Sequence, residues 1–254
     1  MTTLHTLPWL RTADELHCSV AALVELLGGH AEAASGLADE QFGVQRVARG
    51  ASLLHEGAPA HAVYVVQSGS FKCVKTAEDG YEHVLGFAWR RDLLGYDGLA
   101  GAHYAFSEVA LEDSRVVVLP LTGLDALRRR VPELDAALQA KLARQLALAG
   151  DIAEVMAAVA ADVRLARFLV KLAARMAERG ESARRLLLRM NRRDIANHLG
   201  LAHETISRSF GELVEAGWLR VNNRDVQILD PEGLRQCARC TRGVADETPL
   251  RCAA

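Results

Sequence analysis

The 254-residue sequence predicts an α+β protein in which an N-terminal antiparallel β-roll is followed by a long helix and a C-terminal winged helix-turn-helix. Three observations predict this fold class: short β-rich pieces separated by glycines, then apolar residues at helical spacing, then two short helices followed by a hairpin. We expect an N-terminal tail at 1–18, the roll at 19–124, the long helix at 125–160, the winged domain at 161–243 and a C-terminal tail at 244–254.

The composition indicates a folded chain whose two halves carry opposite net charge. Half of the residues are hydrophobic, which is typical of a globular protein rather than a disordered one. Residues 1–159 hold 13 Lys and Arg against 20 Asp and Glu, whereas residues 160–243 hold 16 against 10. An acidic front joined to a basic back predicts that the back half contacts a polyanion such as nucleic acid.

The N-terminus and the cysteines bear on the cellular compartment. The chain does not start with a basic stretch followed by an apolar run, and no apolar stretch reaches the roughly 18 residues that a membrane span needs. The five cysteines are odd in number and scattered, which is typical of a reducing compartment rather than of a disulfide framework. We therefore expect a cytoplasmic protein with no membrane contact.

Residues 42–121 have the pattern of a small antiparallel roll. After a short apolar helix expected around residues 19–27, the pieces AVYVV, FKCVK and EHVLGF alternate with glycines. Asp79-Gly80 is a strong hairpin-turn dipeptide, and SRVVVLPL closes the series. Strand pieces spaced by about ten residues predict a roll or barrel.

From Asp125 the apolar spacing becomes helical and predicts one long helix. Two series of positions seven residues apart, offset by four, form an a/d ladder over about three heptads. We expect a dimer seam, although a helix packed on its own domain's core has the same pattern. Asp151 and Glu154 flank the ladder, so like-charge repulsion is expected to weaken the dimer. The expected seam consists of Leu138, Leu142, Gln145, Ala149, Ile152, Met156 and Val159.

The run NRRDIANHLGLAHETISRSFGELVEAGWLRVNNRDVQIL predicts a helix-turn-helix with a wing. Asn191 and Asp194 have the spacing of a capping box, so a helix is expected to begin there. Two helices joined by a tight turn need a small residue where they cross, a glycine in the turn and a branched anchor in the second helix, and Ala196, Gly200 and Ile206 match these positions. WLRV and VQIL flank NNRD and predict a β-hairpin, the wing.

The second helix of this pair is expected to lie in the major groove of DNA. Glu204, Ser207 and Arg208 are the expected base readers, because arginine can donate two hydrogen bonds to guanine and a carboxylate accepts from cytosine. An exposed ion pair between Glu204 and Arg208 is the simpler alternative. Leu213 and Val214 are expected to be buried. Contacts to phosphate, with a solvated charged face as the alternative, are expected from Arg184, Arg185, Arg189, Arg192, Arg193, His203, Thr205 and Arg220.

These features resemble the CRP/FNR family of bacterial transcription regulators, and its FNR branch in particular. The resemblance covers about residues 16–243 and is strongest in RRDIANHLGLAHETISR, where Glu204, Ser207 and Arg208 form the motif E-x-x-S-R. It implies that the roll is a sensor domain of the cyclic-nucleotide-binding type. It also implies a homodimer that binds an inverted repeat of TTGAT-type half-sites in double-stranded DNA.

The resemblance also implies contact with RNA polymerase, for which the hairpin tip at Asp79 and Gly80 is a candidate surface. One departure from the family lies just before the recognition helix, where a small hydroxylated residue is usual. Ala202 and His203 stand there instead, so a capping hydrogen bond worth roughly 1 kcal/mol is expected to be missing.

The sequence departs from the family's oxygen sensor as well. That sensor is a [4Fe–4S] cluster on four cysteines, three near the N-terminus and one late in the roll. Here Cys18 stands alone at the front and Val117 occupies the late position, so the pattern disfavours a cluster. Cys237 and Cys240 form a C-x-x-C without a second pair, with Cys252 downstream. Cys18, Cys237 and Cys240 are weak candidates for a metal site, and incidental thiols are the favoured interpretation.

The family resemblance implies two other possible sensing modes, cyclic nucleotide binding and haem binding. Cyclic nucleotide binding needs an arginine for the cyclic phosphate, in the segment of the roll called the phosphate cassette. Here that segment contains Gly95-Tyr96-Asp97, and no arginine occurs between Arg91 and Glu108, which disfavours cAMP. Haem remains open as a cofactor. Its candidate ligands are His55, His61, His83 and His103.

The leading hypothesis is a DNA-binding regulator that responds to oxygen limitation, nitric oxide or redox state. A regulator of the same family without an effector and a cyclic-nucleotide-binding module are the alternatives. A β-barrel enzyme with a DNA-binding appendage is disfavoured, because the sequence lacks an H-x-H metal pair and a nucleophile–base pair. We therefore expect no enzymatic activity.

Overall fold

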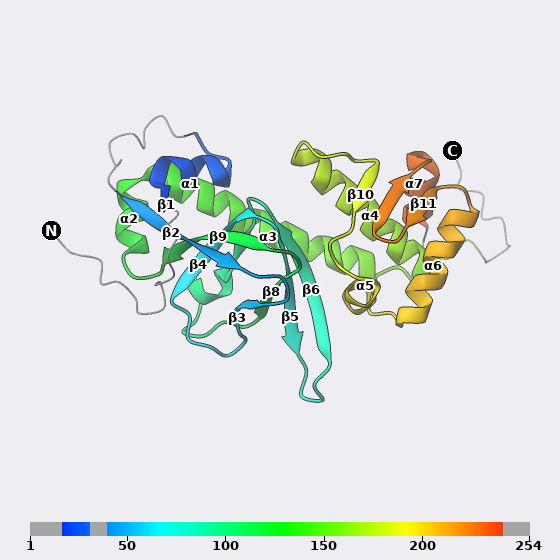
Figure 1. Ribbon diagram of the computed structural model, residues 1–254, viewed down its shortest axis with the longest axis horizontal. Helices are drawn as coiled ribbons and strands as arrows, with labels where there is room; N and C mark the ends of the chain where they lie inside the picture. Colours follow the sequence, from blue (N-terminus) through cyan, green and yellow to red (C-terminus); the bar gives the residue numbers. More distant parts are fainter. Residues whose placement is uncertain (1–16, 31–39, 241–254) are drawn as a thin grey trace. The chain divides into compact units, whose positions relative to one another are not determined.

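The computed structural model describes residues 17–30 and 40–240 (Figure 1). Contacts within the chain divide it into two compact units, Met1–Leu146 and Ala147–Ala254. The first unit is β-rich and the second mainly helical, which confirms the predicted α+β class. In the part of the chain that the structure describes, no helix is both long and apolar enough to cross a bilayer.

The first unit is an antiparallel roll of two sheets, as predicted. One sheet has the strand order β1-β2-β9-β4-β7 and the other has the order β3-β8-β5-β6. Every pairing between neighbouring strands is antiparallel. The elements are β1 (His17–Ser19), α1 (Val20–Leu27), β2 (Gln41–Val47), β3 (Ser52–Leu54), β4 (Ala62–Ser68), β5 (Ser70–Thr76), β6 (Glu82–Trp89), β7 (Leu93–Leu94), the short 3₁₀ helix η2 (Tyr96–Leu99), β8 (Ser107–Ala110) and β9 (Ser114–Pro120).

Strand β4 shows how the roll is packed, because its alternate side chains enter two different cores. Val63 and Val65 pack with helix α1 and the helices that follow the roll. Tyr64 and Val66 pack between the two sheets, together with residues of β5, β8 and β9. A central strand that is buried on both faces accounts for the continuous apolar run AVYVV.

The long β5–β6 hairpin extends beyond the rest of the roll (Figure 1). Its turn contains Asp79 and Gly80, as predicted, and Gly80 has a φ of 82°, which favours glycine. The backbone closes the turn through a hydrogen bond from the N–H of Ala77 to the carbonyl of Tyr81. The predicted turn signal is therefore confirmed.

The helix that was predicted over residues 125–160 is divided in two. Helix α2 covers Leu124–Arg130 and helix α3 covers Pro132–Met156. Val131 between them has φ −128° and ψ 81°, because a residue that precedes proline avoids the helical conformation. Pro132 then starts α3 at the first position, where its missing N–H has no cost.

The ladder on α3 does not form one continuous exposed seam. Leu138 is only 5% exposed and lies in the core of the roll, where Leu142 packs against it. The side chain of Gln145 donates to the carbonyl of Leu93 in the roll at 3.2 Å. The first three seam residues are therefore turned toward their own unit, which corrects the prediction for this part of the helix.

The rest of the ladder is more open to solvent. Ile152 is half-buried, Ala149 is exposed, and Met156 and Val159 are 37% and 77% exposed. Leu146, which was not among the predicted seam residues, is 77% exposed. The exposed apolar surface of α3 thus begins later than predicted and includes a different leucine.

The second unit contains the predicted helix-turn-helix and wing. Its three-stranded antiparallel sheet has the order β10-β12-β11. A final helix after the wing was not predicted, although Asp230 followed by Pro231 is a helix-start signal: Asp230 accepts two backbone hydrogen bonds and Pro231 takes the first turn. The elements are α4 (Ala161–Glu178), β10 (Arg185–Leu187), α5 (Arg192–Leu199), α6 (His203–Glu215), β11 (Leu219–Asn222), β12 (Asp225–Ile228) and α7 (Pro231–Arg239).

Candidate nucleic-acid interface

Helix α5 begins and ends as the sequence predicts. Asn191 accepts a hydrogen bond from the N–H of Asp194 at 2.8 Å, and the Asp194 carboxylate accepts one from the N–H of Asn191 at 3.0 Å. This reciprocal pair is the predicted capping box. Gly200 ends the helix with a φ of 61°, and Ala196 is buried where the two helices cross.

Helix α6 packs through one row of side chains. Ile206, Ser209, Phe210 and Leu213 are buried, at the spacing of three or four residues that defines one helix face. Val214 was predicted to be buried with Leu213, but it is 40% exposed. That prediction is wrong, because Val214 lies one position beyond the buried row and therefore at its edge.

The start of α6 has no side-chain cap, in agreement with the prediction. Ala202 occupies the N-cap position with φ −69° and ψ 149°, and its methyl group accepts no hydrogen bond. His203 and Glu204 follow in the first turn, and both are exposed. The acidic side chain of Glu204 lies favourably at the positive end of the helix dipole.

The three expected base readers lie together on the exposed face of α6. Glu204, Ser207 and Arg208 are all exposed, in the N-terminal half of the helix and away from the buried row. The hydroxyl of Ser207 donates to the carbonyl of His203 at 3.1 Å, which fixes its direction in the free protein. The structure thus brings together the residues that the sequence singled out.

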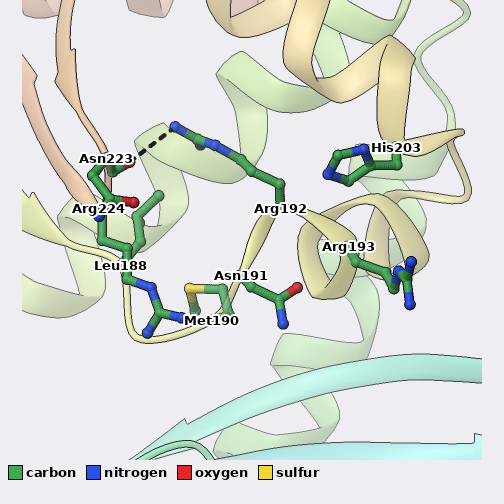
Figure 2. A pocket seen from close by; sticks show the side chains of 8 residues that line it. All are labelled: Leu188, Met190, Asn191, Arg192, Arg193, His203, Asn223 and Arg224. Carbon is green, nitrogen blue, oxygen red and sulfur yellow. Dashed lines mark hydrogen bonds between the residues drawn. The ribbon is translucent and has the colours of Figure 1, made fainter.

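A basic pocket of about 390 Å³ lies beside this helix (Figure 2). It is formed by the loop before α5, the first residues of α5 and α6, and the turn of the wing. Three arginines give it a positive lining, while Leu188 and Met190 contribute apolar surface. The other lining residues are Asn191, Arg192, Arg193, His203, Asn223 and Arg224.

Two neighbouring arginines of this pocket behave differently. Arg193 is exposed and points away from the wing, whereas Arg192 extends toward Asn223 (Figure 2). Arg192 donates from Nη2 to the carbonyl of Asn223 at 3.3 Å, and its guanidinium carbon lies 3.3 Å from the ring centre of Phe210. Burial lowers the pKa of Arg192 to about 10. Arg192 was predicted to contact phosphate, but in the structure its half-buried guanidinium is engaged by Phe210 and Asn223.

The wing is anchored to the rest of its unit by other arginines. Arg185 on β10 pairs with Asp225 on β12, with Nη2 and Oδ2 2.7 Å apart, and this hydrogen-bonded pair lowers the pKa of Asp225. Arg224 in the wing turn donates to the carbonyl of Arg189 at 3.2 Å. Arg185 was predicted to contact phosphate, and the structure gives it an acidic partner instead. Arg224 was not among the predicted residues, although it stands in the quoted NNRD.

The remaining predicted phosphate contacts are distributed around the pocket and the wing. Arg184, Arg189 and Arg220 are exposed, and Thr205 is half-buried in α6. Arg220 donates to the side chain of Gln227 across the hairpin at 3.5 Å. These positions lie on the same unit as the base readers, but only part of them line the pocket.

The roll buries an acidic group that the sequence reasoning did not single out. Cys73 on β5 lies directly opposite Glu108 on β8, and Glu108 is 4% exposed. Burial raises the pKa of Glu108 to about 8, against the opposing effect of a hydrogen bond with Cys73, and nearby Asp97 and Asp92 raise it further. Its Oε2 atom has no hydrogen-bond partner among the described residues. The sequence pattern that could have revealed Glu108 is a charged residue at an inward-facing strand position.

Residues 92–107 of the roll contain no lysine or arginine that could pair with a cyclic phosphate. Tyr96–Leu99 form η2, and Tyr96 and Asp97 lie near Cys73 and Glu108. Arg91 instead donates to the carbonyl of Glu25 at 3.3 Å. This part of the roll therefore carries acidic groups, whereas a bound phosphodiester would need a cation.

The cysteines and histidines do not gather into a ligand set within residues 17–30 and 40–240. Cys18 is buried in the core of the roll, and burial raises its pKa. Burial raises the pKa of Cys237 to about 12, while Cys240 donates to the carbonyl of Gln236. Cys252 lies outside the described residues. The four candidate haem ligands are exposed, namely His55, His61, His83 and His103.

Both units match known domain families. Residues 44–130 match the cyclic nucleotide-binding domain, and residues 163–237 match the Crp-like helix-turn-helix domain. Among solved structures, that of FixK2 from Bradyrhizobium japonicum is similar with a TM-score of 0.68 and 26% sequence identity, over 78% of this chain and 97% of that one. The similarity therefore spans the roll, the connecting helix and the winged domain.

Two curated relatives are also regulatory proteins. The transcriptional regulatory protein btr of Bordetella pertussis is 33% identical over 229 residues, which cover 88% of this chain and 93% of that protein. The fumarate and nitrate reduction regulatory protein of Escherichia coli strain K12 is 34% identical over 199 residues, which cover 78% and 80%. With its roll and its exposed recognition helix, the chain belongs to the CRP/FNR family of transcription regulators, and it carries a Crp-like helix-turn-helix DNA-binding domain.

Proposed function

We propose that the protein is a homodimeric regulator that binds an inverted repeat of TTGAT-type half-sites. One observation carries the proposal: Glu204, Ser207 and Arg208 share the exposed face of the N-terminal half of α6. This is the part of a recognition helix that meets base edges when the helix enters the major groove. The opposite face of α6 is buried, so the helix presents these side chains outward.

The chemistry of the three residues fits such a half-site. Arg208 donates to O6 and N7 of guanine, and Glu204 accepts from N4 of the paired cytosine, so together they read one G·C pair. Ser207 reaches an adjacent thymine or phosphate once its hydroxyl leaves the carbonyl of His203. These contacts supply sequence discrimination, whereas phosphate contacts supply register.

The phosphate contacts are assigned to exposed cationic or polar groups near α6. Arg193 and His203 line the basic pocket, and Arg189 lies on the loop before α5. Thr205 lies in the first turn of α6, where the helix dipole favours an anion. Arg224 is added to the set, because it stands in the wing turn that lines the same pocket.

The homodimer is assigned to the exposed apolar part of α3 and the residues just after it. Leu146 and Val159 are each 77% exposed, and Ala149, Ile152 and Met156 lie between them. Exposed large apolar side chains along one helix are typical of a surface that meets a partner. Asp151 forms an ion pair with Lys171 at 2.7 Å, which reduces the like-charge repulsion expected at this seam.

The signal is proposed to be oxygen limitation, nitric oxide or redox state. The name of the Escherichia coli relative, a fumarate and nitrate reduction regulatory protein, supports a link to the reduction of fumarate and nitrate. A four-cysteine cluster is not part of the proposal, because Cys18 is buried in the core of the roll and Val117 occupies the late position. Cyclic AMP is not proposed as the effector either. Its phosphodiester would need a cationic partner, and the buried side chain in this part of the roll is the acidic Glu108.

Contact with RNA polymerase is proposed for the tip of the β5–β6 hairpin. Asp79, Gly80 and Tyr81 are exposed there, and Tyr81 stacks edge to face on His83 with ring centres 4.8 Å apart. A hairpin that extends from the roll offers such a surface (Figure 1).

The proposal is tested by a gel-shift titration on a duplex with the TTGAT inverted repeat, with aerobic and anaerobic protein in parallel. We expect the protein to bind the repeat at a lower concentration than it binds a scrambled duplex. We also expect the aerobic and the anaerobic protein to differ in their affinity for the repeat. Equal binding under both atmospheres supports a regulator of the same family without an effector. Equal binding to both duplexes contradicts the assigned half-site.

A further inference from the structure

The guanidinium of Arg192 connects three elements of the winged unit. It belongs to the first turn of α5, lies over the ring of Phe210 in α6 at 3.3 Å from the ring centre, and donates to the carbonyl of Asn223 in the wing turn. A cation over an aromatic face and a charge-assisted hydrogen bond both stabilise this position. Figure 2 shows the side chain bridging from α5 to the wing.

Arg192 lines the basic pocket, but its guanidinium is already engaged within the protein by Phe210 and Asn223. Its Nη1 atom is buried and donates to no acceptor among the described residues. A phosphate can reach Nη1 only if Arg192 leaves Phe210 or Asn223. Arg193, the next residue, carries the same charge but is exposed and points away from the wing.

The wing needs such an attachment. It is a two-residue turn between Asn222 and Asp225, and Asn223 has a φ of 55°, a conformation that is strained for most residues and tolerated by asparagine. The strands of the wing are held in a sheet by the pairing of β12 with β10, but Asn223 at the turn lies outside that ladder. The bond from Arg192 to Asn223 ties this turn to the first turn of α5, and the bond from Arg224 to Arg189 ties it to the loop before that helix.

We propose that Arg192 is a positioning residue that holds the wing turn beside the recognition helix, and that it does not contact the DNA backbone. The expected effect on DNA affinity rests on the proposed DNA-binding function, whereas the attachment of the wing by Arg192 is a property of the free protein. With the wing held, Arg224 and Arg193 line the same pocket, so a backbone phosphate meets a preformed basic surface.

The first experiment measures amide hydrogen exchange of residues 221–225 in the full chain without DNA. The variants are Arg192→Lys, which keeps the charge but loses the planar stack, and Arg193→Lys as the matched control at the exposed neighbour. We expect exchange in the wing to become at least about tenfold faster in Arg192→Lys, with little change elsewhere and none in Arg193→Lys. Unchanged wing exchange in Arg192→Lys overturns the proposal.

A second variant keeps the test decisive if Arg192→Lys does not fold. Phe210→Leu keeps an apolar side chain in the core but removes the ring face under Arg192. We expect it to accelerate wing exchange in the same residues. Exchange that rises equally throughout the unit overturns the proposal, because it shows a general loss of stability rather than a released wing.

The second experiment measures affinity for the TTGAT duplex and for a scrambled duplex over a range of salt concentrations. We expect Arg192→Lys to weaken binding about tenfold on both duplexes with an unchanged salt slope, and Arg193→Ala to reduce the slope by about 0.9. Wild-type affinity in Arg192→Lys, together with a reduced slope in Arg192→Ala, shows a phosphate contact and overturns the proposal. If the wild type binds neither duplex, the proposed function fails, and the exchange experiment still decides the role of Arg192.

Discussion

Each unit contains an ionisable side chain with one buried atom that has no hydrogen-bond partner among the described residues, but the physical outcome differs. In the roll, burial raises the pKa of Glu108 to about 8, so the carboxyl is mostly neutral at neutral pH. In the winged unit, burial lowers the pKa of Arg192 only to about 10, so the guanidinium stays charged and relies on Phe210 and Asn223. The roll therefore changes charge near physiological pH, whereas the wing attachment does not.

The largest effect is expected from Glu108→Gln in the roll. The folded protein keeps the proton of Glu108 between the usual pKa of 4.5 and about 8, while the unfolded chain releases it. Stability from this group is therefore present at low pH and lost as pH rises through 8. We expect the free energy of unfolding of the wild type to fall by a few kcal/mol between pH 5 and pH 8, and the Gln variant to lose less.

Urea unfolding at several pH values measures this difference. Glu78→Gln is the matched control, because Glu78 is exposed in the β5–β6 hairpin and carries the same chemical change. If the free energy of unfolding changes in parallel for the wild type and Glu108→Gln from pH 5 to pH 8, the raised pKa of Glu108 is contradicted.

The next largest effect is expected from Arg208→Ala in the winged unit. Loss of two hydrogen bonds to guanine should cost about 1–3 kcal/mol on the TTGAT duplex and relax discrimination at that base pair. Arg193→Ala should weaken binding to all duplexes to a similar degree, because it removes a phosphate contact. Fluorescence anisotropy with matched and guanine-substituted duplexes distinguishes the two. Equal losses of Arg208→Ala on both duplexes contradict the base-reading role.

A comparable effect is expected at the helix that joins the units. Leu146→Lys places a charge on the exposed apolar part of α3, whereas Leu138→Met changes a side chain in the core of the roll with little change of volume. We expect Leu146→Lys to shift the population toward monomer in sedimentation velocity, and Leu138→Met to leave it unchanged. A wild type that is monomeric at micromolar concentration contradicts the proposed seam.

The smallest of these effects is expected from Ala202→Ser at the start of α6. The backbone of Ala202 already has the extended conformation of an N-cap, so a serine hydroxyl can accept a hydrogen bond from the first turn. We expect about 1 kcal/mol of added stability, measured as a higher urea midpoint with an unchanged slope. Ala202→Val serves as the control without a hydroxyl. The same midpoint for both variants would contradict the missing-cap interpretation.

The sequence predicted the elements whose local chemistry is self-contained. The capping box of Asn191 and Asp194, the Gly200 turn and the Asp79-Gly80 hairpin each depend on residues close together in the chain, and the structure shows all three. The recognition-helix residues were also placed correctly on an exposed face, because the apolar row of α6 leaves them no other side.

The predictions that failed depend on contacts between distant segments. A heptad ladder looks the same whether it faces a second chain or its own core, so the position of Leu138 in the roll could not be read from spacing. The charge of Arg192 suggested phosphate, but its packing on Phe210 is a tertiary contact over eighteen positions. Cys73 and Glu108 likewise lie opposite each other only because strands β5 and β8 pair in the roll.

The most direct test of the account is an unbiased selection of binding sites from random duplex DNA by the full-length wild-type protein and by Arg208→Ala. The account predicts that the wild type enriches an inverted repeat of TTGAT-type half-sites and that Arg208→Ala loses the preference at the guanine. Enrichment of an unrelated sequence, or a preference at guanine that survives in Arg208→Ala, would contradict the central claim that the exposed face of α6 reads this half-site.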